Sequence, residues 1–404
     1  MFDIAIVGAG PSGLAAGLAC AASGLRTAII GPPADRHDGR TAALLDGSIN
    51  LLKRLGVWDA LAPASEPLTG IRLVDATGAL LRAPEVFFQA SEIGLSAFGY
   101  NIPNTALTSV FRAACGSAGI TLVNATAADF ELGADAARLV TSDGDTLSAR
   151  LVVAADGRDS AARAAAGIEV TRWSYPQVAI VSTFAHSRPH RGVSTELHRH
   201  VGPLTVVPAP GNTSNLVWVD APEEASRLLA LSDEDFTREL TARLGGLLGT
   251  LSDLASRSGY PLRGQRALAL ARNRVALIGE TAHIMPPIGA QGLNLSLRDG
   301  ATLAEIAGEA KAAGQDIGAE AVLQRYQRLR MTDVRSHVGA VDLLNRLLLS
   351  TVPGVHFARG LGLFALAVSR ELRACVMHEG VMPSYVNPAL MRPLGGVDEV
   401  HAHA

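Results

Sequence analysis

The sequence predicts an α/β fold in which a parallel sheet is interrupted by an antiparallel sheet and followed by a helical C-terminus. Residues 3–30 read strand, glycine turn, helix, strand; residues 176–220 read as short strands separated by Gly, Pro and Asn; residues from 321 onward follow a helical period. A βαβ opening builds a parallel sheet through a right-handed crossover. At 404 residues the chain is too long for one compact core, so we expect two or three intertwined subdomains.

The composition narrows the class of protein. Hydrophobic residues make up 48 % and charged residues 18 %, which points to an apolar ligand or a membrane-surface contact. A net charge of −3 without a long basic run argues against nucleic acid as a partner. The three cysteines, Cys20, Cys115 and Cys375, are far apart, which favours a reducing compartment over disulfides or a zinc site.

Neither end of the chain predicts a membrane span. The N-terminus reads directly as a strand and lacks the basic flank of a signal peptide. The apolar stretch 338–376 is interrupted by charges and by Pro353, and its charge-free runs fall short of the ~20 residues that cross a bilayer. We expect a cytoplasmic protein that is soluble or peripheral on the inner face of the membrane.

Further elements follow from the same patterns. We expect helices at 48–55, 105–116, 228–254 and 293–310, and short strands at 71–75 and 85–89. A strand pair at 121–130 and 137–141 should join a strand at 151–155 through the turn Asp143-Gly144-Asp145. Antiparallel strands are expected at 177–184, 194–198, 204–208 and 215–220, and a buried strand at 274–278.

The first chemical motif is Gly8-x-Gly10-x-x-Gly13, which lies between the first strand and the first helix. Gly8 permits the tight turn, Gly10 lets the backbone approach a pyrophosphate, and Gly13 lets the helix lie close to the strand. The helix N-terminus offers free N–H groups to phosphates. NAD, NADP and FAD proteins all use this pattern, so it predicts a Rossmann-like dinucleotide site without choosing the cofactor.

The end of the second strand departs from that pattern. An acidic residue ordinarily stands there and holds the adenosine ribose. Here the position is Gly31, followed by Pro32 and Pro33, and Asp35 is the nearby substitute. We therefore expect a weaker grip on the adenosine end of the cofactor.

Two later turns complete the motif set. The strand 151–155 delivers Asp156-Gly157, which alone is a common turn. The strand 275–278 delivers Gly279-Glu280 at its carboxyl end, where open α/β sheets bind ligands. A dense Pro and Gly loop, residues 286–292, then starts a helix whose N–H groups suit an anionic ring edge.

In this order the three motifs resemble the class A flavoprotein aromatic hydroxylases, and within them the ubiquinone-biosynthesis hydroxylase branch. The likeness runs from residue 3 to about 335 and includes 39–44, 99–104, 177–181, 202–204 and the spacing Leu323-x-x-Tyr326-x-x-x-Arg330-x-x-Asp333. It implies a fold like that of p-hydroxybenzoate hydroxylase. The FAD-binding domain would comprise 1–70, 100–175 and 265–335, the substrate domain 71–99 and 176–264, and a C-terminal helical region 336–404.

The resemblance also implies the cofactors. FAD is bound, and NAD(P)H is a transient co-substrate. Gly8, Gly10 and Gly13 are assigned to the FAD pyrophosphate with Arg40 beside it, and Glu280 stands where the family usually has Asp. The other positions assigned to FAD are Asn104, Ala127, Asp156, Gly157, Gly279, Gly289, Gly292, Leu293 and Asn294. No residues are assigned to a metal.

The implied reaction hydroxylates the ring of a polyprenylated phenol or quinone precursor with O2 through a flavin C4a-hydroperoxide. The helix N-terminus at 292–294 suits the anionic reduced flavin, and Pro286, Pro287 and Ile288 suit a dry wall. The candidate catalytic residues are Pro287, Gly289 and His200.

Several polar side chains are weaker candidates for assisting substrate deprotonation, namely Tyr175, Glu196, His198 and His200. The Glu-x-His-x-His spacing also fits a solvated edge strand, and it lacks a third ligand for a metal. We expect His283 to be a packed, hydrogen-bonded histidine and not a base.

Other functions remain open at this stage. A flavin-dependent reductase of an isoprenoid substrate, or a non-catalytic FAD-bound subunit of a ubiquinone-synthesis assembly, would carry the same motifs. A flavin halogenase is disfavoured because the three tryptophans form no Trp-x-Trp pair. Residues 340–376 are expected to form a membrane-docking face, with an oily core or a dimer interface as the alternatives, and other ubiquinone-biosynthesis proteins are candidate partners.

Overall fold

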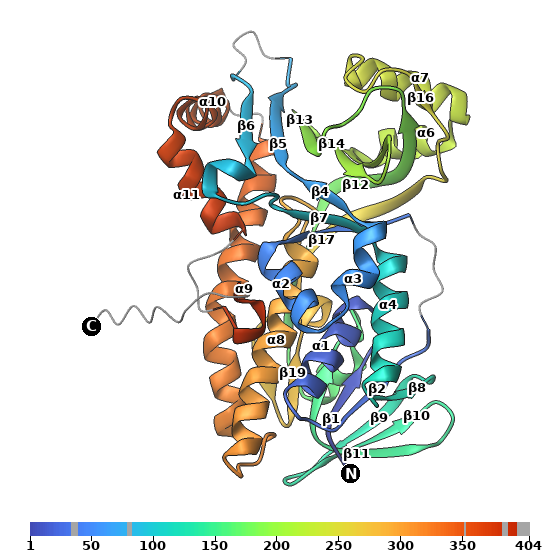
Figure 1. Cartoon of the computed structure of the whole chain (residues 1–404), viewed down its shortest axis with the longest axis vertical. Coiled ribbons are helices and arrows are strands. Elements are labelled where there is room, and N and C mark those ends of the chain that lie inside the picture. Colours follow the sequence, from blue (N-terminus) through green and yellow to red (C-terminus); the bar gives the residue numbers. More distant parts are fainter. Residues whose placement is uncertain (34–38, 79–82, 351–352, 382–386, 394–404) are drawn as a thin grey trace.

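The computed structural model describes residues 1–33, 39–78, 83–350, 353–381 and 387–393. Within these residues the strands form an eight-stranded sheet, a nine-stranded sheet and a three-stranded sheet. Figure 1 shows the eight-stranded sheet at the lower end of the molecule, the nine-stranded sheet at the upper end, and long helices running between them. The expected α/β architecture with a helical C-terminus is confirmed.

The parallel sheet is the centre of the lower half. Its parallel strands are β19 (Val275–Leu277), β11 (Thr146–Ala154), β1 (Phe2–Val7), β2 (Thr27–Ile30) and β8 (Thr121–Val123), in that order. Their buried apolar runs are typical of strands covered on both faces. Antiparallel extensions are β18 (Ala271–Arg272), β9 (Ala127–Leu132) and β10 (Ala137–Thr141).

One strand prediction in this sheet is wrong. Residues 121–130 form two strands, because β8 pairs with β2 whereas β9 turns away to pair with β10. The predicted turn at Gly144 does join β10 to β11.

The helices around the parallel sheet are α1 (Pro11–Ala22), α4 (Asn104–Ser117), α5 (Ala161–Ala165), α8 (Gln291–Ala312) and α9 (Glu320–Leu349). Helices α1 and α8 cross closely because small residues line the contact. A Cβ on Gly300 would lie 2.9 Å from the Cβ of Ala16, and one on Gly308 would lie 3.0 Å from the Cβ of Ser23. The expected start of a C-terminal region at residue 336 falls inside α9.

The nine-stranded sheet, called the mixed sheet below, lies above this half. Its strands are β20 (His283–Ile284), β17 (Ser258–Ala267), β12 (Val170–His186), β15 (Thr213–Asp220), β14 (Gly202–Ala209), β13 (Val193–Arg199), β5 (Gly70–Asp75) and β6 (Val86–Gln89), with β16 (Leu251–Ser252) on β12. Most neighbours are antiparallel, and β13 and β5 are parallel.

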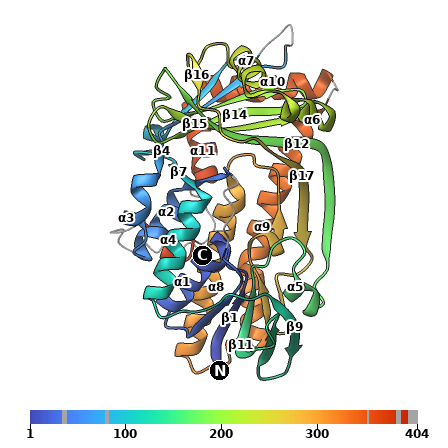
Figure 2. The same ribbon diagram turned by 90° about the vertical axis from the view of Figure 1, so that its right-hand side faces the viewer.

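Two helices cover the outer face of the mixed sheet, as Figure 2 shows. They are α6 (Pro222–Ala230) and α7 (Asp233–Leu244), whereas the sequence predicted one helix over 228–254. Ser232 interrupts that helix, because its hydroxyl caps α7 by accepting from the backbone N–H of Asp235. Helix α7 ends at Gly245 in a left-handed conformation, φ 58°.

The remaining elements connect the two halves. A three-stranded sheet consists of β3 (Thr41–Leu45), β7 (Gly99–Pro103) and β4 (Glu66–Leu68), and two short helices, α2 (Asp46–Arg54) and α3 (Trp58–Leu61), follow β3. Tight 3-10 turns occur at Ala62–Ala64, Ala90–Ile93, Gly279–Thr281 and Ala389–Met391. Helices α10 (Pro353–Val368) and α11 (Arg370–Val381) pack against β6 and its turn, at the upper left of Figure 1.

Candidate cofactor site

The three sequence motifs meet at one edge of the parallel sheet. They follow the carboxyl ends of β1, β11 and β19, which are adjacent strands. A Cβ on Gly8 would lie 2.2 Å from the carbonyl oxygen of Ala155, so the first turn touches the second. A Cβ on Gly279 would lie 3.3 Å from Oγ of Ser12, so the third turn touches the first helix. The sheet topology thus builds one site from residues about 270 positions apart.

The first turn is shaped by steric necessity. Gly8 has φ +116°, and a Cβ on Gly13 would lie 2.0 Å from the carbonyl oxygen of Gly8. A Cβ on Gly10 would meet nothing within 4 Å, so this glycine borders open space. Gly10 caps α1 without a side-chain hydrogen bond, which leaves the first N–H groups of the helix available to an anion.

The structure explains the missing acid at the end of β2. Gly31 is buried, and a Cβ there would lie 2.6 Å from the backbone nitrogen of Ala9 and 2.9 Å from its Cβ. The glycine turn therefore packs onto Gly31 and excludes a side chain at this position. Asp35 lies outside the described residues.

At the second turn the Asp156 carboxylate supports the backbone. It accepts hydrogen bonds from the Ser160 hydroxyl at 2.6 Å and from the Ala162 N–H at 3.3 Å, which holds the start of α5. Gly157 has φ +84° with open space around it. The open surface of this turn is therefore glycine backbone.

The third turn is exposed on one side and held by hydrogen bonds on the other. Glu280 is exposed, and the loop before α8 reaches the helix through two left-handed residues, Gly289 (φ 65°) and Ala290 (φ 56°). A Cβ on Gly292 would meet nothing within 4 Å. The Asn294 side chain is fully used: its oxygen accepts from Leu45 N–H and Ser48 hydroxyl, and its amide donates to Ala43 and Ala290 carbonyls. Besides the exposed Glu280 carboxylate, this turn therefore offers a ligand its backbone N–H groups.

A cluster of buried, mostly charged side chains packs beneath the third turn and is hydrogen-bonded to it. We call it the buried cluster, and its members are Asp299, His283, Arg330, Asp333 and Arg298. Asp299 accepts from the Gly279 N–H at 3.1 Å, contacts Nε2 of His283 at 2.7 Å, and accepts from Nε of Arg330 at 2.8 Å. Asp333 bridges Arg330 and Arg298, the latter at 2.8 Å. His283 is 2 % exposed, so the prediction of a packed, hydrogen-bonded histidine is confirmed.

The cluster sets the charge state of its carboxylates. Burial alone would raise the pKa of Asp299, but Arg330 and His283 lower that pKa below its usual value. Burial likewise opposes ionisation of Asp333, and the hydrogen bond from His337 together with the charges of Arg330 and Arg298 holds its pKa well below the usual range. Both carboxylates are ionised at neutral pH.

Three further residues that the sequence assigns to the cofactor lie on other elements. Asn104 begins α4, and its Oδ1 is buried without a hydrogen-bond partner among the described residues. The Arg40 guanidinium lies 5.4 Å from the ring centre of Tyr260 on β17. Ala127 is the first residue of β9 and is half-buried.

These residues fit a flavin dinucleotide. Each of the three turns presents a glycine bordered by open space, Gly10, Gly157 and Gly292. Two helix N-termini, those of α1 and α8, lack side-chain caps, and their free N–H groups suit a diphosphate and an anionic ring edge. The unpartnered amide oxygen of Asn104 supplies an acceptor that a sugar-alcohol hydroxyl would satisfy.

The candidate catalytic residues lie on two different segments. Pro287 and Gly289 are exposed in the loop between β20 and α8, and His200 is exposed in the turn between β13 and β14. The alternative of a solvated edge strand for Glu196 and His198 is wrong, because β13 pairs with both β14 and β5. Oε2 of Glu196 lies 3.4 Å from Nε2 of His198, and the two side chains are 19 % and 10 % exposed.

Tyr175 is committed to a structural contact. Its hydroxyl accepts from Nε1 of Trp173 at 2.6 Å and donates to Asp342 of α9. Burial, followed by the Asp342 hydrogen bond, raises the pKa of Tyr175 to about 12. At neutral pH this phenol keeps its proton, which removes it as a general base.

Sequence reasoning missed the buried cluster as a unit. The spacing of Tyr326, Arg330 and Asp333 carries no predicted role, and no role is predicted for Arg298 or Asp299. A signal is present, because an adjacent Arg and Asp are the charged residues in an otherwise uncharged helical stretch between Leu295 and Leu303. Charged residues are rarely buried unless paired, so a charge pair inside a buried helix predicts partners.

None of the helices in the described part of the chain is both long and apolar enough to traverse a bilayer.

Comparisons with known proteins agree with this geometry. Residues 1–337 match the FAD binding domain family. The chain is 35 % identical over 403 residues to ubiquinone hydroxylase UbiL of Rhodospirillum rubrum, covering 98 % of this chain and 93 % of that protein. It is 32 % identical over 375 residues to 3-demethoxyubiquinol 3-hydroxylase of Escherichia coli, covering 90 % and 94 %.

Solved structures share the fold. Two of them are p-nitrophenol 4-monooxygenase PnpA of Pseudomonas putida and a variant of Klebsiella pneumoniae HpxO complexed with FAD. They superpose with TM-scores of 0.77 and 0.76 at 18 % and 19 % identity, and each comparison covers 95 % of this chain and 99 % of the other. The family match spans all three turns, and the chain therefore belongs to the FAD binding domain family, as an FAD-dependent monooxygenase.

Proposed function

We propose that the chain hydroxylates the aromatic ring of a polyprenylated ubiquinone precursor, with NAD(P)H and O2 as co-substrates. The observation that carries this proposal is the meeting of three glycine turns at one sheet edge, with a second helix N-terminus at α8. Two relatives are named ubiquinone hydroxylase UbiL and 3-demethoxyubiquinol 3-hydroxylase, and these names support ring hydroxylation as the reaction and ubiquinone biosynthesis as the pathway. When bound, FAD takes electrons from NAD(P)H and activates O2 for transfer of one oxygen atom to the ring.

The binding roles divide among the three turns. Gly8, Gly10 and Gly13 hold the diphosphate at the start of α1, with Arg40 beside it, and Ala127 meets the adenine through its backbone. Asn104 and Glu280 accept from the ribityl hydroxyls. Backbone at the second and third turns contacts the ring system, at Asp156, Gly157, Gly279, Gly289, Gly292, Leu293 and Asn294.

The α8 N-terminus supplies the main electrostatic contribution. The N–H groups of Gly292 and Leu293, which precede the first hydrogen-bonded turn of α8, would stabilise the ring edge where negative charge develops on reduction. Since the Asn294 side chain is held by β3 and α2, these N–H groups are fixed before the cofactor arrives. Preorganised dipoles stabilise charge without reorganisation during the reaction.

The chain shapes the substrate side by excluding water. Pro286 is buried and Pro287 is exposed next to it, which gives a stiff apolar wall at the ring. Tyr175 and His283 are both buried and hydrogen-bonded inside the protein. We assign the phenolic proton to the imidazole of His200, which is exposed in the turn between β13 and β14. In this proposal Pro287 and Gly289 belong to the wall at the ring, and His200 is the proton acceptor.

An oxygen-tracing experiment tests the function. The FAD-loaded protein is supplied with NADPH or NADH, a short-chain prenylphenol and labelled O2, and the product is analysed by mass. We expect one labelled oxygen atom in the ring and substrate-stimulated NAD(P)H oxidation. A reduced isoprenoid chain without label would establish the reductase alternative, and no stimulated oxidation would leave only the non-catalytic subunit.

A membrane contact is the second part of the proposal. Large apolar side chains are exposed along one region of α9, α10 and α11: Leu343, Leu344, Leu347, Leu361, Phe364, Val368, Leu372 and Val376. Leu361, Phe364 and Val368 follow the i, i+3, i+7 spacing of one helix face. A polyprenylated substrate resides in the bilayer, so we propose that this face docks on the inner membrane surface.

Liposome sedimentation tests the contact with a matched control. The triple variant L361E/F364E/V368E should lose vesicle binding while keeping FAD. Leu268, 51 % exposed between β17 and β18, serves as the control, since L268E should bind vesicles like the unaltered protein. Unchanged binding by the triple variant would refute the docking face.

The division into FAD-binding, substrate and C-terminal regions stays a prediction.

A further inference from the structure

A cavity of about 310 Å³ lies in the mixed sheet, away from the cofactor site. Its floor includes Thr195 of β13 and Val206 of β14, which face each other across the strand pair. Val206 belongs to the core that α6 and α7 cover, whereas Tyr175 and Val219 on the opposite face pack with Leu349 of α9. Because side chains alternate between sheet faces, the cavity and the cofactor site lie on opposite sides of the sheet.

Two hydrogen-bonded turns wall the cavity. The β12–β13 turn, residues 187–192, is joined to the loop 246–250 after α7. Ser187 N–H donates to Thr250 O at 3.0 Å, Arg188 N–H donates to Leu248 O at 3.0 Å, and Thr250 N–H donates to the Ser187 hydroxyl at 2.9 Å. The walls are therefore built structure, and Leu247 and Leu248 add an apolar side.

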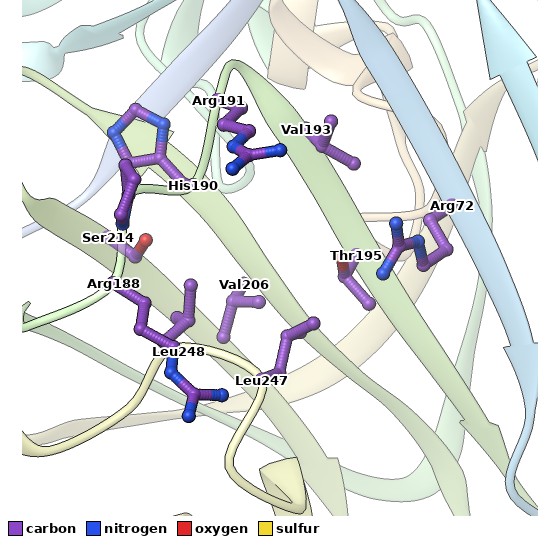
Figure 3. Close-up of a pocket in the computed structure, with 11 residues that line it drawn as sticks. Arg72, Arg188, His190, Arg191, Val193, Thr195, Val206, Ser214, Leu247 and Leu248 are labelled. Carbon is purple, nitrogen blue, oxygen red and sulfur yellow. The ribbon is translucent and has the colours of Figure 1, made fainter.

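Three arginines surround this space, as Figure 3 shows. Arg188 donates one side-chain hydrogen bond, to Gly246 O at 3.0 Å, and the Arg191 side chain makes no ion pair or hydrogen bond with any residue that the structure describes. Arg72 lies 3.1 Å from Glu85, which is half exposed. Three arginines therefore border the cavity, and within the described residues Glu85 is the carboxylate that pairs with one of them.

The neighbouring histidine is a support and not a binding group. Nε2 of His190 lies 3.0 Å from the Ala209 carbonyl oxygen and 2.9 Å from that of Gly211, so it carries the proton. Nδ1 accepts from the Gly192 N–H at 3.1 Å. These bonds tie the His190 ring to the strand ends on both sides and hold the β12–β13 turn in place.

Two polar groups at the cavity have no hydrogen-bond partner within the described residues. Thr195 lines the cavity, and its side chain, 3 % exposed, makes no hydrogen bond there. Nε of Arg72 lies 3.1 Å from Oε1 of Glu85 without forming a hydrogen bond to it. A ligand with acceptor oxygens in the cavity would give both groups a hydrogen-bond partner.

We propose that this cavity binds an amphipathic phosphate monoester. Its dianionic head would lie between Arg188 and Arg191 and accept from Arg72 and Thr195, since guanidinium groups match phosphate in charge and geometry. Its apolar body would lie over Val206 and the two leucines. The volume is at the lower end of ordinary small-molecule sites. The sheet separates this ligand from the flavin, so it is not a reactant.

Calorimetry on the FAD-loaded protein tests the site, because FAD then occupies the other phosphate-binding region. The probes are octyl phosphate, below its micelle concentration, and inorganic phosphate. We expect octyl phosphate to bind more tightly, and the double variant R188Q/R191Q to lose roughly tenfold or more in affinity. R238Q removes an exposed arginine paired with Asp235 on α7 and should bind like the unaltered protein.

A second variant guards against a folding artefact. T195V keeps the side-chain volume and removes the unpartnered hydroxyl, so it should raise the melting temperature without ligand and weaken octyl phosphate binding. Vesicles of phosphatidic acid and phosphatidylcholine then separate the sources, because the phosphatidic acid headgroup is a phosphate monoester. Loss of binding to phosphatidic acid vesicles in R188Q/R191Q identifies a lipid headgroup, and unchanged vesicle binding with lost octyl phosphate binding identifies a free ester. Equal octyl phosphate affinity in the double variant and the unaltered protein would overturn the site.

Discussion

The first and third turns of the cofactor site sit at the same sheet edge and are built in different ways. The first, Gly8 to Gly13, is shaped by contacts within a few residues and to the adjacent strand, and each of its two tight glycines is required by backbone atoms 2.0 to 2.2 Å from where a Cβ would be. The third, Gly279 to Asn294, rests on the buried cluster, whose members come from β20, α8 and α9. One turn is local and steric, and the other is long-range and electrostatic.

This difference determines what each turn can tolerate. A steric turn fails when any atom is added at its closest positions. A turn held by paired charges fails when a charge is removed, because the remaining partner stays buried and unpaired. The following predictions test that contrast, beginning with the largest effect.

Adding a side chain at Gly13 should prevent folding of the first turn. A Cβ there would lie 2.0 Å from the Gly8 carbonyl oxygen, and the backbone cannot move aside without separating α1 from β1. We expect G13V to give no soluble, flavin-loaded protein. G10V is the matched variant: open space surrounds Gly10, so this protein should fold but lack bound FAD in its absorption spectrum.

If G13V were yellow and as stable as the unaltered protein, the steric account of the first turn would be wrong. If G10V retained FAD, the assignment of this turn to the diphosphate would fail.

Removing Asp299 should cost about 3–5 kcal/mol of unfolding free energy, because the buried Arg330 would keep Asp333 as its single carboxylate partner and Nε2 of His283 would lose its hydrogen-bond partner. Denaturant unfolding of D299A measures this loss. E131A, which breaks an exposed pair with Arg138, should leave the unfolding midpoint unchanged. A D299A midpoint equal to that of E131A would contradict the role of the buried cluster.

Acid should destabilise the third turn and not the first. The pKa values of Asp299 and Asp333 are depressed in the folded protein, so their contribution is complete above the unfolded pKa of about 3.9 and is lost as the pH falls toward their folded values. Each carboxylate then removes up to about 1.4 kcal/mol per pH unit. Unfolding curves at pH 5, 4 and 3 should show a smaller decline for D299N than for the unaltered protein, and G10V should decline like the unaltered protein.

The smallest effect is expected at the edge of the buried cluster. The Tyr326 hydroxyl donates to the Leu277 carbonyl at 2.7 Å and ties α9 to the end of β19. Y326F should lose about 1 kcal/mol of unfolding free energy and keep its FAD content. A loss as large as that of D299A would mean that Tyr326 belongs to the cluster and does not merely border it.

The same contrast explains what could be predicted from the sequence. The glycine turn, its strands and α1 were predictable because their contacts are local and their residue types have few alternatives. The strand break after Val123 was not predicted, since it depends on which neighbouring strand the chain pairs with. The cap at Ser232 is a local signal, a Ser three residues before an Asp, and it was not used to divide the helix. The pairing of Asp299 with Arg330, and of Arg298 with Asp333, depends on α8 and α9 lying side by side, which no local pattern specifies.

The candidate site divides in a similar way. The three turns were found because strand, turn and helix repeat a known chemistry. The arginine cavity was not found, because Arg72, Arg188 and Arg191 come together only through the strand register of the mixed sheet. The unpartnered oxygen of Asn104 likewise becomes visible only when its surroundings are known.

The buried Gly31 has a consequence for how this sequence can change. An acid at this position would place its Cβ 2.6 Å from the backbone nitrogen of Ala9, so a single substitution to Glu would distort the glycine turn before its carboxylate could reach a ribose. The effect of an acid at position 31 therefore depends on a second change. The backbone of the turn at Ala9 must shift before position 31 can accept a side chain that binds the ribose. Directed evolution for tighter adenosine binding should begin with libraries at positions 8–10, and position 31 becomes permissive only afterward.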